Sequence, residues 1–164
     1  MHINTHTIIF ITLILMGISG WPGCKSIHTE IAIQASPREV WEVISANDRY
    51  PEWNPYHVRV DGELVEGSTL DVKIHKPNGN RVEIQPQVIT VTPEKELTWG
   101  GGIPGLFTGT HVFEIVQREK DVLFIQREQF RGLFVWFAEL DSIEEGYDLM
   151  NRALKARAEN STIP

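Results

Sequence analysis

The fold of this chain is decided by the stretch Leu140-Asp141-Ser142-Ile143-Glu144-Glu145-Gly146-Tyr147-Asp148-Leu149-Met150-Asn151-Arg152-Ala153-Leu154. Its apolar residues at positions 140, 143, 147, 150 and 154 are three or four apart, which predicts an amphipathic helix within Phe130–Glu159. The preceding chain reads mainly as strands. Because a long helix after a run of strands buries its apolar face on a sheet, we expect an α+β domain with a curved antiparallel sheet. A cavity between sheet and helix would be the place for function.

The first strand is expected at Ile27–Gln34, where apolar and polar residues alternate. A short helix through about Ser45 follows. Ser36 is a good N-cap, Pro37 occupies the first helical position, and Glu39 has the spacing of a capping box. Two prolines then break regular structure, and Pro51 could begin a second helical turn.

Further strands are expected at His57–Leu64, Leu70–Ile74, Val82–Ile84, Val88–Val91, Glu96–Trp99, Thr108–Gln117 and Val122–Phe130. Pro77–Gly79 predicts a three-residue hairpin loop with Gly79 in the left-handed conformation. The segment Gly100–Phe107 is predicted to be an apolar loop without a fixed shape, because it opens with three glycines. It lacks the Gly-Lys-Ser/Thr of a phosphate-binding loop, and no cofactor is expected.

The composition indicates one globular domain. The chain has 164 residues, of which 41% are hydrophobic and 23% charged, so it can form one sizeable core. Fifteen Lys and Arg stand against 22 Asp and Glu, for a net charge of -7. Without a basic run, the sequence does not support nucleic-acid binding or electrostatic docking on anionic lipid.

Residues 1–24 are expected to be a signal peptide or an N-terminal membrane anchor, and residues 25–164 the ligand-binding domain. Ile8–Ile18 is an apolar run too short for a spanning helix. Cys24 is the only cysteine, so no internal disulfide forms. Its position resembles a bacterial lipoprotein signal with Cys24 lipidated, although Trp21 and Pro22 depart from that pattern. An incidental cysteine is the alternative. Either way we expect an exported or membrane-associated protein of the cell envelope.

The last predicted hairpin brings two ionisable side chains together. If Gln117 lies opposite Val122, then Phe113 faces Gln126 and His111 faces Glu128, and all of them share one face with Phe130. This face is the more aromatic one, so we expect it to line the cavity. A His111–Glu128 pair could orient a polar ligand group or act as acid and base. It could equally be a structural hydrogen bond.

Three motifs in order resemble the polyketide cyclase/dehydrase and lipid-transport group of the START/Bet v 1-like (SRPBCC) superfamily. They are Ser36-Pro37-Arg38-Glu39-Val40-Trp41, Tyr50-Pro51-Glu52-Trp53-Asn54-Pro55 and Glu128-Gln129-Phe130-Arg131-Gly132. The resemblance covers about Ile27 to Glu159. It implies the helix-grip fold, in which a curved antiparallel sheet with two short helices after the first strand wraps a long C-terminal helix. It also implies an apolar ligand in the cavity.

The first hypothesis is a non-catalytic protein that binds a small hydrophobic or amphipathic, lipid-like or polyketide-like ligand. The alternative is a cyclase or dehydratase using His111 and Glu128 as acid and base. The candidate ligand-binding residues are Trp99, Phe107, His111, Phe113, Gln126, Glu128, Phe130, Phe134, Tyr147 and Met150. For the apolar ones, plain core packing is the alternative. The scattered histidines indicate no metal site.

Overall fold

A computed structural model describes residues 23–161 as two antiparallel sheets, two α-helices and two 3-10 helices. The elements in chain order are β1 (Gly23–Ile33), α2 (Pro37–Ser45), η1 (Asn47–Glu52), β2 (His57–Asp61), β3 (Asp71–His75), β4 (Arg81–Ile84), β5 (Gln87–Thr92), β6 (Glu96–Ile103), β7 (Phe107–Gln117), β8 (Val122–Gly132), η2 (Leu133–Phe137) and α3 (Ile143–Ser161). One sheet has the order β1-β8-β7-β6-β5 and the other β2-β3-β4.

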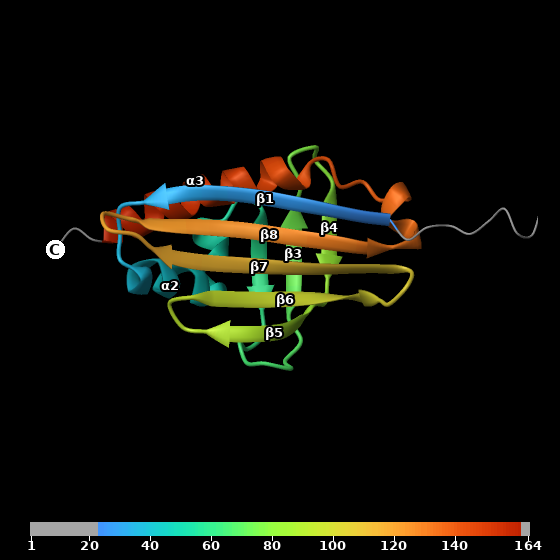
Figure 1. Ribbon diagram of the computed structural model, residues 1–164, viewed down its shortest axis with the longest axis horizontal. Helices are drawn as coiled ribbons and strands as arrows, with labels where there is room; N and C mark the ends of the chain where they lie inside the picture. Colours follow the sequence, from blue (N-terminus) through green and yellow to red (C-terminus); the bar gives the residue numbers. More distant parts are fainter. Residues whose placement is uncertain (1–22, 162–164) are drawn as a thin grey trace, which may run out of the picture.

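The helix-grip prediction is confirmed. Helix α3 lies behind the five-stranded sheet, and the strands of the smaller sheet cross behind it (Figure 1). A single bridge between Thr69 and Gln87 links the two sheets. Tyr147, Met150 and Leu154 on α3 are at most 2% exposed, so the predicted apolar stripe is buried. Leu140 is buried too but precedes the helix.

The predicted registers are also confirmed. Gln117 pairs with Val122, and His111 pairs with Glu128. Ile74 pairs with Val82, around a three-residue loop in which Gly79 has a φ of 88°. Both results follow from loop length, because one residue more or less would move every side chain to the other face.

The first helix forms as expected from its cap. Ser36 Oγ accepts a hydrogen bond from the Glu39 amide, and the Glu39 carboxylate accepts one from the Ser36 amide, which completes a capping box. The second short helix is the 3-10 helix η1. It begins at Asn47, and Pro51 lies inside it rather than at its start.

The glycine-rich segment is the main correction to the predicted elements. Gly100–Ile103 continues β6 and pairs with β7, so only Pro104–Leu106 forms the turn. Gly102 has a φ of 114°, and a Cβ there would overlap the Phe107 carbonyl. The three glycines therefore allow the backbones of β6 and β7 to pair closely, whereas a loop without a fixed shape was predicted from the sequence. In addition, β1 starts at Gly23, four residues before the predicted strand, and Cys24 pairs with Arg131.

Candidate functional site

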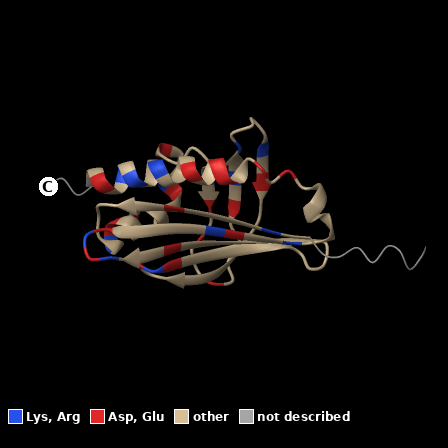
Figure 2. Ribbon diagram, turned by 45° about the horizontal axis from the view of Figure 1, so that its top comes forward, with Lys and Arg blue, Asp and Glu red and all other residues tan. Residues whose placement is uncertain are grey.

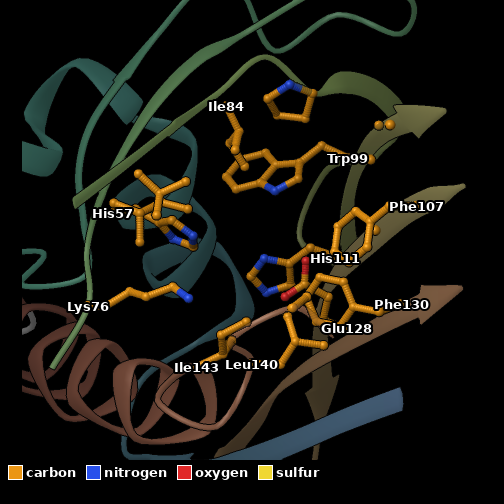
Figure 3. A pocket seen from close by; sticks show the side chains of 18 of the residues that line it. His57, Lys76, Ile84, Trp99, Phe107, His111, Glu128, Phe130, Leu140 and Ile143 are labelled. Carbon is orange, nitrogen blue, oxygen red and sulfur yellow. The ribbon is translucent and has the colours of Figure 1, made fainter. Parts of the chain in front are cut away.

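A cavity of about 420 Å³ lies between the two sheets and the start of α3 (Figure 3). Its walls combine aromatic and aliphatic side chains with bare glycine backbone from β6 and β7. The lining residues are Tyr56, His57, Ile74, Lys76, Val82, Ile84, Gln85, Pro86, Trp99, Gly100, Gly101, Gly102, Phe107, Gly109, His111, Glu128, Phe130, Ala138, Glu139, Leu140, Ile143 and Tyr147. Its volume falls in the range of small-molecule sites, about 300–1,000 Å³.

Glu128 is the carboxylic acid that β8 places in this cavity, and its main partner is Tyr147. The Tyr147 hydroxyl donates a short hydrogen bond to Glu128 Oε2. Burial raises the pKa of Glu128 to about 7, although the hydrogen bond from Tyr147 and the charge of Lys76 oppose the increase. The protonated and the ionised form of Glu128 are therefore both accessible near neutral pH.

His111 is a register partner of Glu128, but its hydrogen bonds go elsewhere. Its Nε2 lies 3.0 Å from Gln126 Oε1, and its Nδ1 lies 3.4 Å from the Tyr147 hydroxyl. Tyr147 therefore stands between the two residues that were expected to pair directly. Since Gln126 Oε1 can only accept, Nε2 carries the imidazole proton and Nδ1 is an acceptor. Burial, with nearby His57, lowers the pKa of His111 well below its usual value, so the ring is neutral.

Behind His111 a chain of polar groups continues away from the cavity. Gln126 Nε2 donates to Asn151 Oδ1 at 2.7 Å, and Asn151 Nδ2 donates to Thr29 Oγ1 at 3.0 Å. All three side chains are buried, and each needs its partner because an unpaired buried polar group costs about 1–3 kcal/mol. The chain therefore fixes the position of His111 from β1, β8 and α3.

His57 is a cavity residue that sequence reasoning did not assign to the ligand. It is 2% exposed, and burial lowers its pKa to about 3. Its Nδ1 has no hydrogen-bond partner among the described residues. A β-bulge between His57 and Arg59 shifts the pairing register, so simple alternation could not place His57 on the inner face.

Lys76 was also missed, and here the sequence does carry a signal. It continues the inner positions Val72 and Ile74 by the strand period of two. Its ammonium approaches from the side opposite Glu128 (Figure 3). It donates to the backbone carbonyl and to the carboxylate of Glu139, both at 2.6 Å. This hydrogen bond lowers the pKa of Glu139.

The predicted ligand residues divide into two groups. The cavity lining contains Trp99, Phe107, His111, Glu128, Phe130 and Tyr147. Phe113, Gln126 and Met150 do not line it; they are fully buried in the core beside it. Phe134 lies in η2 with 53% exposure and does not reach the cavity. A 3-10 turn has no period that distinguishes its inner from its outer residues over so short a run.

Two further predictions concern metal and membrane. Within residues 23–161 no three His, Cys, Asp or Glu side chains gather as a metal site would require. In the same range, no helix combines the length and apolar character that crossing a bilayer demands. The expected signal or anchor, residues 1–24, lies outside the described part except for its last two residues, which begin β1. Cys24 is on the surface of β1, and its lipidation stays a prediction.

Fold and cavity together define a helix-grip domain with an internal, mainly apolar chamber. The sequence profile described as "Polyketide cyclase / dehydrase and lipid transport" matches residues 25–160. The chain therefore belongs to this family of the START/Bet v 1-like (SRPBCC) superfamily. No curated protein sequence matches it.

Solved structures agree on the fold. Norcoclaurine synthase from Thalictrum flavum, in complex with dopamine and hydroxybenzaldehyde, has a TM-score of 0.66 and 19% identity, covering 87% of this chain and 91% of its own. Major latex-like protein 151 from Panax ginseng has a TM-score of 0.67 and 14% identity, covering 82% and 97%. The di-domain ARO/CYC StfQ of steffimycin biosynthesis has a TM-score of 0.68 and 13% identity, covering 84% and 52%.

Proposed function

We propose that this protein binds a small, mainly apolar molecule with one polar group in the 420 Å³ cavity. The supporting observation is the combination of mainly apolar walls with a partly buried carboxyl, Glu128, held by Tyr147. Burial of ligand carbon would supply affinity at about 25 cal/mol per Å². Glu128 and His57, whose Nδ1 lacks a partner among the described residues, would orient the polar group. The norcoclaurine synthase of similar fold holds small aromatic molecules.

The test uses 1-aminoanthracene, a fluorescent amine with an apolar body, and a substitution that fills the cavity. A Cβ at Gly101 would lie 3.5 Å from Pro86 Cα, an ordinary contact, so the side chain of Gly101→Leu starts without a backbone clash from a residue that lines the cavity. We expect the parent protein to enhance the probe's fluorescence and Gly101→Leu to abolish this enhancement.

Thr110→Leu is the matched control, because it adds the same side chain to an exposed position of the neighbouring strand. It should bind as the parent does. Equal binding by Gly101→Leu and the parent would place the probe elsewhere and contradict the proposal.

A second candidate is a cyclase or dehydratase in which Glu128 transfers a proton. The observation that favours it is the pKa of about 7, which suits a carboxyl to acid and base work near neutral pH. When Glu128 is protonated, it can donate to the Tyr147 oxygen while the Tyr147 hydroxyl donates to Nδ1 of neutral His111, which would then position Tyr147 rather than act as the base. Exchange of the acidic protons of 1-phenylbutane-1,3-dione in D₂O tests the idea. It should be accelerated by the parent with a midpoint near pH 7 and not by Glu128→Gln; equal rates would reject it.

A further inference from the structure

One end of the molecule carries a cluster of exposed apolar side chains, here called the apolar tip. It consists of Ile103, Leu106, Leu133, Phe134, Trp136 and Phe137, each between 39% and 83% exposed. The β6–β7 turn and η2 form it jointly, because the amides of Leu133 and Phe134 donate to the carbonyls of Gly105 and Leu106. Trp136 is 72% and Phe137 83% exposed. Large apolar side chains gathered in this way mark a site of interaction.

The apolar tip is also free of charge. Neither Ile103–Phe107 nor Gly132–Ala138 contains a charged residue. In Figure 2 this end of the molecule is tan, whereas α3 carries acidic and basic residues along its length. A partner that binds here must therefore be apolar at its surface, and salt should affect the contact little.

The chain itself leads from the apolar tip to its most apolar segment. Gly23 begins β1 against this end, and a Cβ there would crowd Val135 and Trp136. Only residues 19–22 separate Gly23 from the run Ile8–Ile18. At about 3.6 Å per residue, this connection spans at most about 18 Å. Whatever apolar phase receives Ile8–Ile18 therefore lies within reach of the apolar tip.

We infer that the apolar tip docks on a lipid bilayer, with Trp136 and Phe137 inserted into the interfacial layer. Aromatic side chains are favoured at that depth. The run Ile8–Ile18, eleven residues with Thr12 among them, is too short to cross a bilayer as a helix. A weak anchor needs a second contact to hold a protein stably on the membrane. The apolar tip supplies this contact. Ile8–Ile18 is a less suitable occupant of the apolar tip than lipid. If this run, which is apolar on nearly all sides, folded back over the apolar tip, one side of it would remain exposed to water.

Docking in this way sets the cavity at the bilayer. Phe107 and Ala138 line the cavity and directly follow Leu106 and Phe137 of the apolar tip. A ligand that partitions into lipid would be concentrated beside the cavity wall. This inference is independent of which ligand binds there.

The test labels the full-length chain at the apolar tip. Cys24 is the only cysteine, so a Cys24→Ser, Phe137→Cys variant carries one thiol for the fluorophore NBD. With vesicles of neutral phosphatidylcholine we expect a blue shift and quenching by doxyl-labelled phosphatidylcholine. Cys24→Ser, Val65→Cys is the matched control, since Val65 is 56% exposed and lies outside the apolar tip, and its label should not respond.

Two other occupants give different results. If Ile8–Ile18 or a second copy of the chain covers the apolar tip, the label at position 137 is already blue-shifted without lipid and does not respond to vesicles. If Ile8–Ile18 alone binds lipid, the protein floats with the vesicles but the label escapes quenching. Either result, or failure to float, overturns the proposal.

A partition measurement needs no label. Trp136→Ser, Phe137→Ser should lower partitioning of the full chain into phosphatidylcholine vesicles by on the order of tenfold. Val65→Ser should leave it as in the parent. Partitioning of the double variant equal to that of the parent would also overturn the proposal.

Discussion

Glu128 and Tyr147 form a hydrogen-bonded pair in the cavity, and the pKa of each is raised. Because Tyr147 O–H donates to the carboxylate, it offers part of the stabilisation that water would give. Its own pKa is raised well above the usual value by burial and by Glu128. The cavity therefore holds an ionisable carboxyl beside two histidines that remain neutral.

The stability of the protein should depend on pH through Glu128. The pKa is about 7 in the folded protein against 4.5 for the unperturbed group. The contribution of Glu128 to folding is therefore fully present below about pH 4.5 and is lost as the pH rises through 7. We expect a loss of about 1–3 kcal/mol, since each pKa unit is worth about 1.4 kcal/mol and water in the cavity reduces the effect.

Urea unfolding of Glu128→Gln at pH 5 and pH 8 measures this loss. Glu128→Gln should lack the part of the pH-dependent loss that comes from Glu128. Its free energy of unfolding at pH 8 should exceed that of the parent. Glu63→Gln, at an exposed loop position, should follow the parent. A Glu128→Gln variant that is less stable than the parent at pH 8 would contradict the prediction.

At the residue scale, the sequence predicts what a hairpin controls. His111, Phe130 and Glu128 could be placed on one face because a four-residue loop determines the parity of both strands. The bond of Tyr147 to Glu128 could not be predicted, because it joins a strand to a helix whose rotation depends on packing. His57 was out of reach because of the bulge beside it.

At the element scale, α3 is positioned by a glycine in its first turn. A Cβ on Gly146 would overlap the ring of Tyr56, which packs edge-on against Tyr147 at 5.3 Å between ring centroids. The missing side chain lets the segment before β2 lie directly on α3. A glycine inside a helix costs about 1 kcal/mol relative to alanine. Here the close approach of Tyr56 explains why a glycine is present.

Gly146→Ala should therefore destabilise the protein. In an open helix the change would add about 1 kcal/mol of stability, but here the overlap with Tyr56 should cost about 1–3 kcal/mol, and we expect a net loss. The urea midpoint measures it. In a double-mutant cycle with Tyr56→Ala, the cost of Gly146→Ala should largely disappear. A Gly146→Ala variant more stable than the parent would contradict the prediction, because it would show that the Tyr56 ring moves aside at little cost.

Elements with a regular period or a defined cap could be predicted, and those shaped by long-range pairing could not. Helix α2 could be predicted from its start signals Ser36, Pro37 and Glu39. The first half of β6, Glu96–Trp99, could be predicted, but its continuation Gly100–Ile103 could not be recognised, because only pairing with β7 makes the three glycines part of a strand.

At the scale of the whole molecule, the sequence predicts a sheet around a helix but not how much space remains between them. Two sheets joined by one bridge pack on α3 over their shared core. The cavity lies where His57, Lys76 and residues of the segment Ala138–Ile143 line a space that side chains do not fill. Whether apolar side chains fill a core or surround a ligand depends on distances between elements, which hydrophobic periodicity does not contain.

The glycines of β6 and β7 leave part of the cavity wall without side chains, so they determine how much free volume the cavity has. On its inner wall a methyl group would be accommodated at Gly101, whereas at Gly109 it would press on Phe130 and Glu128 at 3.2–3.3 Å. A side chain at Gly101 would therefore reduce the free volume of the cavity without moving the strands. If the cavity binds a ligand as proposed, a larger side chain at position 101 should lower the largest ligand size that still binds.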